Sequence, residues 1–245
     1  MDNSEIIKSF ESQKNLNPKI WEKKQKDYVM NPEVRKKLLE VSNLFIDFLG
    51  VDVVITDIIM IGSLVNYNWS KFSDIDLHIV VNYSQFPENT KDLYVEFFDL
   101  KKVIFNNKHN IKMFGYDVEC FVQDEVETTF SSGIYSVLFD MWVNEPKKIS
   151  MENIDKPLIK EKAKQWMRII DGIVDNIEDE NPEEIKSIVK KYKEKLKKFR
   201  NCGLEKNGEM AIENLVFKLL RRNGYIGKLY DIPTELIDKK LSMNQ

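Results

Sequence analysis

Two aspartates in a short apolar segment carry the clearest chemical signal in the sequence. Asp74 and Asp76 open the otherwise largely apolar run 74–81. Alternate residues of a β-strand point to the same face, so the two carboxylates would lie about 6–7 Å apart on one side. Burying both is costly unless a cation neutralises them. Because Mg²⁺ prefers hard oxygen ligands and usually binds one or two protein carboxylates plus substrate phosphates, the pattern predicts a phosphate-handling metal site.

The dipeptide Gly62-Ser63 supports this interpretation. It follows the apolar run 58–61. A glycine at the end of a strand lets a ligand approach the backbone closely, and a serine hydroxyl with nearby N–H groups can bind phosphate oxygens. The loop that follows adds Lys71 and Ser73. We take Gly62, Ser63, Lys71 and Ser73 as candidate nucleotide-binding residues.

The order of these elements resembles the DNA polymerase beta-like nucleotidyltransferase superfamily. The resemblance rests on Gly62-Ser63, a ten-residue spacer (64–73), and Asp74-Ile75-Asp76 inside a second apolar strand. Segment 62–78, together with 118–124 and 132–136, looks like a group of small nucleotidyltransferase-like proteins, many of them encoded by phages. The resemblance covers roughly residues 20–145 and fades in the C-terminal third.

The superfamily also uses a third carboxylate on a later strand, and the run 113–124 offers two candidates. Alternation places Asp117, Glu119 and Phe121 on one face. We favour Glu119, because Asp117 follows Gly115-Tyr116 and would lie at the strand entrance. Asp117 remains the alternative.

The resemblance implies transfer of a nucleoside monophosphate from a nucleoside triphosphate to an acceptor hydroxyl, with release of pyrophosphate. Asp74, Asp76 and Glu119 would be the catalytic residues and would bind two Mg²⁺ (or Mn²⁺) ions, while Gly62 and Ser63 would hold the β- and γ-phosphates. The acceptor, whether RNA, a protein or a small molecule, stays open. The alternative is a degenerate nucleotide-binding or partner-binding regulatory module without catalysis, against which the three carboxylates argue.

Two further residues have both a functional and a structural interpretation. His78 shares the face of Asp74 and Asp76, so it is either a phosphate or acceptor contact, or a proton shuttle, or a partly buried histidine hydrogen-bonded to the sheet. Lys218 lies on a predicted helix with Asn214 and Arg221 on the same face. That face is either a triphosphate contact or an ordinary solvated surface.

Composition indicates an intracellular globular enzyme. The net charge is only −3, which disfavours a basic duplex-binding polymerase. The two cysteines, Cys120 and Cys202, are far apart, which favours free thiols in a reducing compartment. We find no leader and no apolar stretch of about 18 residues, so we expect no membrane association and a cytoplasmic protein, in the host cytoplasm if it is phage-encoded. The oligomeric state is open.

The pattern of apolar residues predicts an α/β (α+β) nucleotidyltransferase palm with a mixed sheet in residues 1–150, followed by a helical domain in residues 151–245. Asn31-Pro32 and Gly50 delimit one helix. The predicted strands are 54–61, 74–81 and 113–123. The predicted helices are 3–13, 18–29, 32–49, 87–106, 132–145, 157–177, 182–202 and 209–222, with a short final helix after Pro233.

Overall fold

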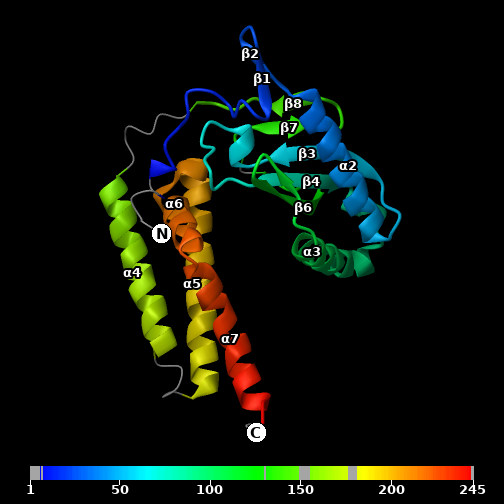
Figure 1. Ribbon diagram of the computed structural model, residues 1–245. Coiled ribbons are helices and arrows are strands. Elements are labelled where there is room, and N and C mark those ends of the chain that lie inside the picture. Colours follow the sequence, from blue (N-terminus) through cyan, green and yellow to red (C-terminus); the bar gives the residue numbers. More distant parts are fainter. Residues whose placement is uncertain (1–5, 7, 130, 149–154, 176–180, 244–245) are drawn as a thin grey trace. The chain divides into compact units, whose positions relative to one another are not determined.

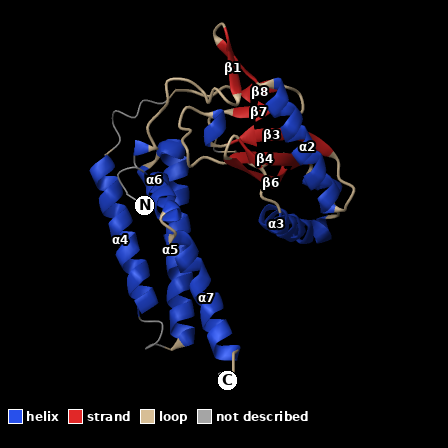
Figure 2. Ribbon diagram, in the orientation of Figure 1, coloured by secondary structure: helices blue, strands red, loops and turns tan. Residues whose placement is uncertain are grey.

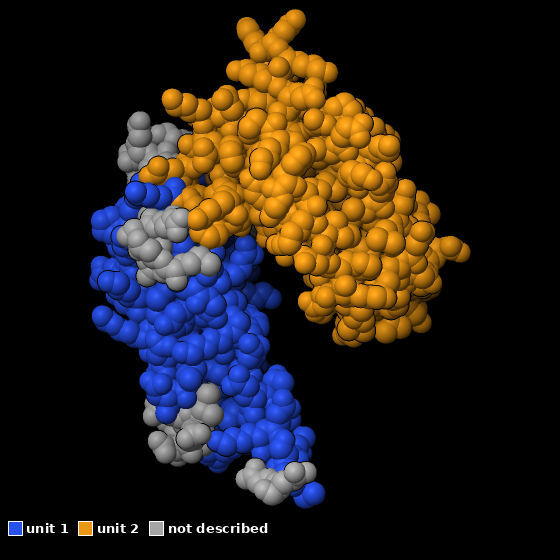
Figure 3. Space-filling model, in the orientation of Figure 1, with its two compact units in different colours: residues 1–8, 152–245 blue, residues 9–151 orange. Residues whose placement is uncertain are grey.

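The structure is a computed structural model that describes residues 6, 8–129, 131–148, 155–175 and 181–243 of the chain. The chain divides into two compact units, which we name the sheet unit (residues 9–151) and the helical unit (residues 1–8 and 152–245) (Figure 3). The predicted fold class, a mixed α/β sheet with a helical C-terminal region, is confirmed.

The sheet unit is built on six strands in the order β5-β6-β4-β3-β7-β8 (Figures 1 and 2). Neighbouring strands are antiparallel except β4 and β6, which are parallel. Two parallel neighbours need a long crossover, and a helix between them provides it here. The strands are β3 (Ile55–Ile61), β4 (Ile75–Val81), β5 (Lys112–Met113), β6 (Tyr116–Asp124), β7 (Ile134–Ser136) and β8 (Met141–Asn144).

Two helices, α2 (Pro32–Leu49) and α3 (Lys91–Lys108), contact each other and pack against the sheet. The predicted ends of α2 are confirmed. The Asn31 side chain accepts the N–H groups of Glu33 and Val34, and Gly50 adopts the left-handed conformation with φ 70°. Helix α3 is the crossover between β4 and β6 and follows the short 3₁₀ turn Glu88–Thr90.

The two faces of the sheet differ in character. On one face, alternate residues of β4 are fully buried and form one core with α2 and α3. Val118 and Cys120 of β6 lie in register with Ile75 and Leu77 on this face. The opposite face carries Asp76 and the other polar residues in the same strand alternation. The predicted carboxylate site and the apolar core therefore lie on opposite faces of the same strand, β4.

An asparagine closes part of the edge of the sheet. Strand β5 is so short that it pairs only with Tyr116 and Asp117 of β6. Beyond it, the Asn106 side chain of α3 donates to the Cys120 carbonyl (3.1 Å) and accepts the Cys120 N–H (3.0 Å). One amide group thus takes the place of a neighbouring strand and satisfies both backbone groups of Cys120.

The predicted third strand is interrupted by a tight turn. Phe114 and Gly115 both have positive φ (53° and 89°), which folds β5 back on β6. The alternation expected for the second half of the run is confirmed, with Val118 and Cys120 facing the core.

The predicted helix at residues 18–29 is wrong. This segment forms the hairpin β1 (Trp21–Lys24) and β2 (Asp27–Met30), whose tight turn includes Gln25 at φ 56°. The buried Trp21 donates its indole N–H to the Leu64 carbonyl (2.7 Å) and holds the hairpin on the sheet unit. Of the predicted helix 3–13, residues 3–5 and 7 lie outside the described residues, Ile6 and Lys8 are helical, and residues 9–13 are not.

The predicted helix at residues 132–145 is also wrong, because the segment forms the hairpin β7–β8. Its aromatic residues recur at a spacing that fits a helix as well as a hairpin. Tyr135 and Trp142 are partners across the two strands, and both pack on Trp21. The turn between the strands uses Asp140 at φ 57°, whose carboxylate accepts the Tyr135 hydroxyl. Cross-strand packing therefore decides between two periodicities that the sequence leaves equal.

The helical unit contains α4 (Lys156–Asp175), α5 (Pro182–Asn207), α6 (Ile212–Arg222) and α7 (Tyr225–Leu241). Buried residues of α4 recur every three or four positions, from Ile159 to Ile173, as an amphipathic helix requires. Asn181 caps α5, and α6 ends at Asn223-Gly224. Residues 176–180, between α4 and α5, lie outside the described residues.

The final helix begins earlier than predicted, before Pro233 and not after it. Helix α7 begins at Tyr225 and continues through Pro233. The buried residues Leu229, Ile232 and Leu236 lie on both sides of the proline and bury one continuous face. Packing of this face outweighs the usual cost of an internal proline. Across the described residues, we find no helix that is both long and apolar enough to cross a membrane.

Candidate metal and phosphate site

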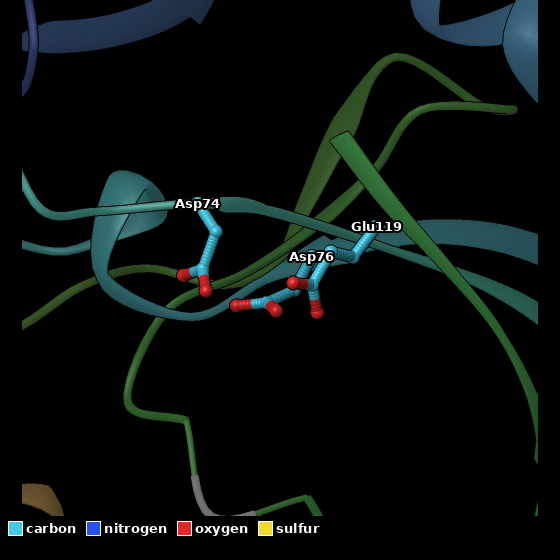
Figure 4. A group of neighbouring side chains, drawn as sticks. All are labelled: Asp74, Asp76 and Glu119. Atoms are coloured by element: carbon cyan, nitrogen blue, oxygen red, sulfur yellow. The ribbon is translucent and has the colours of Figure 1, made fainter. Parts of the chain in front are cut away.

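Three carboxylates converge on the polar face of the sheet. Asp74, Asp76 and Glu119 each offer a carboxylate oxygen, and these three atoms lie within 4.8 Å of one another. Figure 4 shows the three side chains directed toward a common space. The convergence anticipated from the spacing of Asp74 and Asp76 is present.

The pairing of two strands produces this convergence. Asp76 and Glu119 are partners in the parallel register of β4 and β6, so their side chains project from the same face of the sheet. Asp74 comes two residues before Asp76, at the point where the chain enters β4. Neighbouring strands are about 4.8 Å apart. The carboxylates of two register partners on one face can therefore bind the same cation.

Asp117, the alternative third carboxylate, is directed elsewhere. It lies near the start of β6, is exposed, and forms an ion pair with Lys112 of β5. Of the two acidic residues on β6 that the sequence offered, Glu119 is the one grouped with Asp74 and Asp76.

Gly62 lies directly against the Asp76 carboxylate. A Cβ atom built at Gly62 would be 2.0 Å from Asp76 Oδ2, far closer than two such atoms can approach. Gly62 also has φ 84°, in the region that residues with side chains rarely adopt. The position therefore requires glycine twice, for its conformation and for the room it leaves to Asp76.

Serine hydroxyls connect the turn after β3 to the start of β4. Ser63 Oγ donates to Ser73 Oγ (2.7 Å), and Ser73 Oγ accepts the N–H of Ser70 (3.0 Å). Ser73 is buried and directly precedes Asp74. Ser63 and Ser73, both candidate nucleotide-binding residues, thus lie side by side next to the first carboxylate.

The two lysines among the candidate residues differ in surroundings. Lys71 is exposed, with its ammonium 5.0 Å from the centre of the Phe72 ring. Lys218 lies on α6 in the helical unit. Burial lowers the pKa of Lys218. The carboxylate of Glu209 opposes this downward shift, whereas the cations Arg222, Arg221 and Arg200 add to it.

His78 is half-buried beside an aromatic side chain. Its ring stacks on Phe121, with ring centres 4.6 Å apart and planes 18° apart. Burial lowers the pKa of His78 to about 4, although the Gln123 side chain opposes this shift. The imidazole is therefore neutral at neutral pH, which agrees with the structural interpretation of this residue.

No role was predicted for Asn66, Ser131 or Ser132, yet their side chains form a hydrogen-bond network beside Gly62. Asn66 Nδ2 donates to the Gly62 carbonyl (2.6 Å), and the Gly62 N–H donates to Ser131 Oγ (3.3 Å). Ser132 Oγ donates to Asn66 Oδ1 (2.6 Å). The available signal was a cluster of small polar residues before β7, but nothing in the sequence pairs them with a loop about 65 positions earlier.

The donor set fits a divalent metal ion. Carboxylate oxygens are the preferred ligands of hard cations such as Mg²⁺ and Mn²⁺, and three of them lie within one coordination sphere of one another. Three neighbouring negative charges repel one another, and a bound cation relieves this repulsion directly.

Comparisons with known proteins add little to this description. No family model matches the chain, and no curated protein matches its sequence. Among solved structures, the chain matches the "STING-associated CdnE c-di-GMP synthase from Capnocytophaga granulosa" with 14% sequence identity. The match covers 98% of this chain and 100% of that chain, with a TM-score of 0.24. A likeness this weak carries no functional argument, so the chemistry depends on the residues themselves.

Proposed function

We propose that this protein is a metal-dependent nucleotidyltransferase, which transfers a nucleoside monophosphate from a nucleoside triphosphate to an acceptor hydroxyl and releases pyrophosphate. The observation that carries the proposal is the convergence of Asp74, Asp76 and Glu119 within 4.8 Å, from two parallel strands and beside a glycine turn. The same order of motifs underlies the resemblance to the DNA polymerase beta-like superfamily.

In this proposal the carboxylates provide the electrostatics of the reaction. Asp74, Asp76 and Glu119 would hold Mg²⁺ or Mn²⁺. When bound, these ions polarise the phosphates and lower the pKa of the attacking hydroxyl. The rigid sheet fixes the carboxylate positions before substrate binds, so little reorganisation is needed during the reaction.

The turn after β3 would orient the triphosphate. Ser63, at the start of this connection, and Ser73, just before β4, hold their hydroxyl groups together. A phosphate oxygen can accept a hydrogen bond from such a hydroxyl, and the exposed Lys71 is close in sequence to contribute positive charge. These roles agree with the Gly-Ser pattern from which we inferred a phosphate grip.

Within the helical unit, Lys218 belongs to a group of cations that we propose as a contact for an anionic ligand. Arg200 is stacked on Phe217, with its guanidinium 4.4 Å from the ring centre, and donates to Asn214 (3.1 Å). Burial lowers the pKa of Arg200, and Arg221 contributes to this shift. Neighbouring cations repel one another, and an anionic ligand would offset that repulsion.

The experiment that tests the proposal is label transfer. Purified protein is incubated with Mg²⁺ or Mn²⁺, each α-labelled nucleoside triphosphate in turn, and cellular RNA, protein and small molecules as acceptors. Asp76→Asn is the test variant, because it keeps the shape of the side chain and removes its charge. Asp92→Asn, an exposed residue of α3, is the matched control.

We expect label to reach one acceptor class with the wild type and with Asp92→Asn, and none with Asp76→Asn. Undiminished transfer by a folded Asp76→Asn variant would refute the metal mechanism. Nucleotide binding without any transfer would favour the alternative, a nucleotide-binding regulatory module. The class of labelled product identifies the acceptor.

A further inference from the structure

Asn66 forms the centre of a hydrogen-bond network beside the three carboxylates. Its amide nitrogen donates to the Gly62 carbonyl (2.6 Å) and to Ser131 Oγ (3.0 Å). Its amide oxygen accepts the Ser132 hydroxyl (2.6 Å). The partners on both sides fix which end of the amide is nitrogen. The residue is only 3% exposed, so these bonds are made away from bulk water.

The network holds both polar groups of the Gly62 backbone. Asn66 binds the carbonyl, and the N–H donates to Ser131 Oγ (3.3 Å). Ser131 Oγ in turn donates to the Gly133 carbonyl (2.7 Å) and accepts from Asn66. The conformation of Gly62 is thereby set by two side chains from different parts of the chain.

Close packing leaves this network little freedom. A Cβ atom at Gly133 would be 2.4 Å from the Val65 carbonyl oxygen and 2.9 Å from Asn66 Oδ1. The segment 131–133 therefore presses on the turn after β3 with no side chain between them. A buried amide that lost its hydrogen-bond partners here would be strongly destabilising. This cost favours a single arrangement of the network.

The position of Gly62 matters for Asp76, because the glycine Cα lies where only a hydrogen atom leaves room for Asp76 Oδ2. A shift of the turn by a few tenths of an ångström toward β4 would displace this carboxylate. A shift away would remove this contact with the carboxylate. The Asn66 network therefore fixes Gly62, and Gly62 in turn contacts the Asp76 carboxylate.

We propose that Asn66 is a positioning residue of the metal site, acting through Gly62 to fix the Asp76 carboxylate in its ligating orientation. The inference rests on the proposed function, because it assumes that Asp76 binds a divalent metal. It adds to the site a residue that contacts neither metal nor substrate. Partners of this indirect kind typically change metal affinity by about 10–100-fold.

The test measures Mn²⁺ binding to the full-length protein by electron paramagnetic resonance, with no nucleotide present. Asn66→Ala removes the bonds to Gly62 and Ser131. Ser132→Ala is the matched control, because it removes one bond to Asn66 but leaves the bond from Asn66 to Gly62. Circular dichroism and thermal unfolding establish that each variant is folded.

We expect Asn66→Ala to weaken Mn²⁺ affinity by about tenfold or more, and Ser132→Ala to change it by less than about twofold. If Asn66→Ala does not fold, Ser131→Ala removes the acceptor of the Gly62 N–H and should also weaken Mn²⁺ affinity. Unchanged Mn²⁺ affinity in folded Asn66→Ala, or equal weakening by Ser132→Ala, would overturn the positioning role of Asn66. Either result would leave the proposed function standing. Wild-type protein that binds no Mn²⁺ would overturn the proposed function as well.

Discussion

Asp76 of β4 and Glu119 of β6 are direct register partners in the one parallel strand pair among the described strands of the sheet. The same register places Leu77 opposite Cys120 on the other face, inside the core. The metal-binding geometry and the core packing are therefore two consequences of one pairing. Asp74, at the entrance to β4, completes the group.

The third carboxylate can be identified by a pair of substitutions on one strand. Glu119→Gln should lower Mn²⁺ affinity and nucleotidyl transfer by about a hundredfold or more, since even indirect partners of a metal reach that range. Asp117→Asn should change both by less than about twofold, because Asp117 is exposed and paired with Lys112. Isothermal titration with Mn²⁺ measures the first quantity and label transfer the second. The reverse ranking would assign the role to Asp117.

Glycine at position 62 should be required both for stability and for the site. Gly62→Ala places a methyl group 2.0 Å from Asp76 Oδ2 at a residue with φ 84°. We expect a loss of about 2–4 kcal/mol in the free energy of unfolding, from backbone strain and displacement of neighbouring atoms, together with weaker Mn²⁺ binding.

Gly115→Ala is the control for this substitution. Its φ is 89°, but no atom lies within 4 Å of the added methyl group. Gly115→Ala should lower the free energy of unfolding by about 1 kcal/mol, from backbone strain alone, and leave Mn²⁺ binding unchanged. Urea denaturation compares the two variants. An equal loss of stability in both would show that the contact with Asp76 carries no energetic weight.

The edge-closing asparagine should contribute measurably to stability. Asn106→Ala removes both hydrogen bonds to the Cys120 backbone and leaves these groups without their side-chain partner. We expect a loss of about 1–3 kcal/mol in the free energy of unfolding. Asn107→Ala, an exposed neighbour on the same helix with the same gain in helix propensity, should change it by less than about 0.5 kcal/mol. Similar values for the two variants would contradict the edge-closing role.

The two cysteines should differ strongly in reactivity. Both are free thiols; Cys202 is exposed, whereas Cys120 is buried in the core. Burial raises the pKa of Cys120 to about 12, so at pH 8 only about one part in ten thousand of this thiol is ionised. A thiol reagent at pH 8 should therefore modify one cysteine in the native protein and two in guanidinium. Cys202→Ser should abolish the native reaction, and two rapid equivalents in the native wild type would contradict this prediction.

The sequence predicted the three carboxylates and the strands nearest to them. The run 74–81 reads as a strand because its apolar residues alternate with polar ones, and the ends of α2 follow from Asn31-Pro32 and Gly50. Glu119 was chosen over Asp117 by its distance from a turn, and it is the residue that joins the two aspartates. In each case the information is local or has a fixed period.

The two hairpins could not be predicted in this way. In the segment 132–145 the aromatic residues occur at helical spacing, and only packing on Trp21, more than a hundred positions earlier, favours strands. Helix α7 runs through Pro233 because its buried face is continuous, which is a property of its neighbours. The contact of Asn66 with Ser131 and Ser132 is likewise long-range and non-periodic, so no local pattern reports it.

The parallel pairing of β4 with β6 ties the chemistry of this protein to the correctness of its fold. A slip of one residue between these strands would turn Glu119 into the apolar interior and bring a valine or cysteine beside Asp76. A chain with that error could neither bury its apolar core nor bring its three carboxylates together. Divalent metal would then stabilise only the properly registered molecules, and a rise in melting temperature on adding Mn²⁺ would serve as a quality test for each preparation.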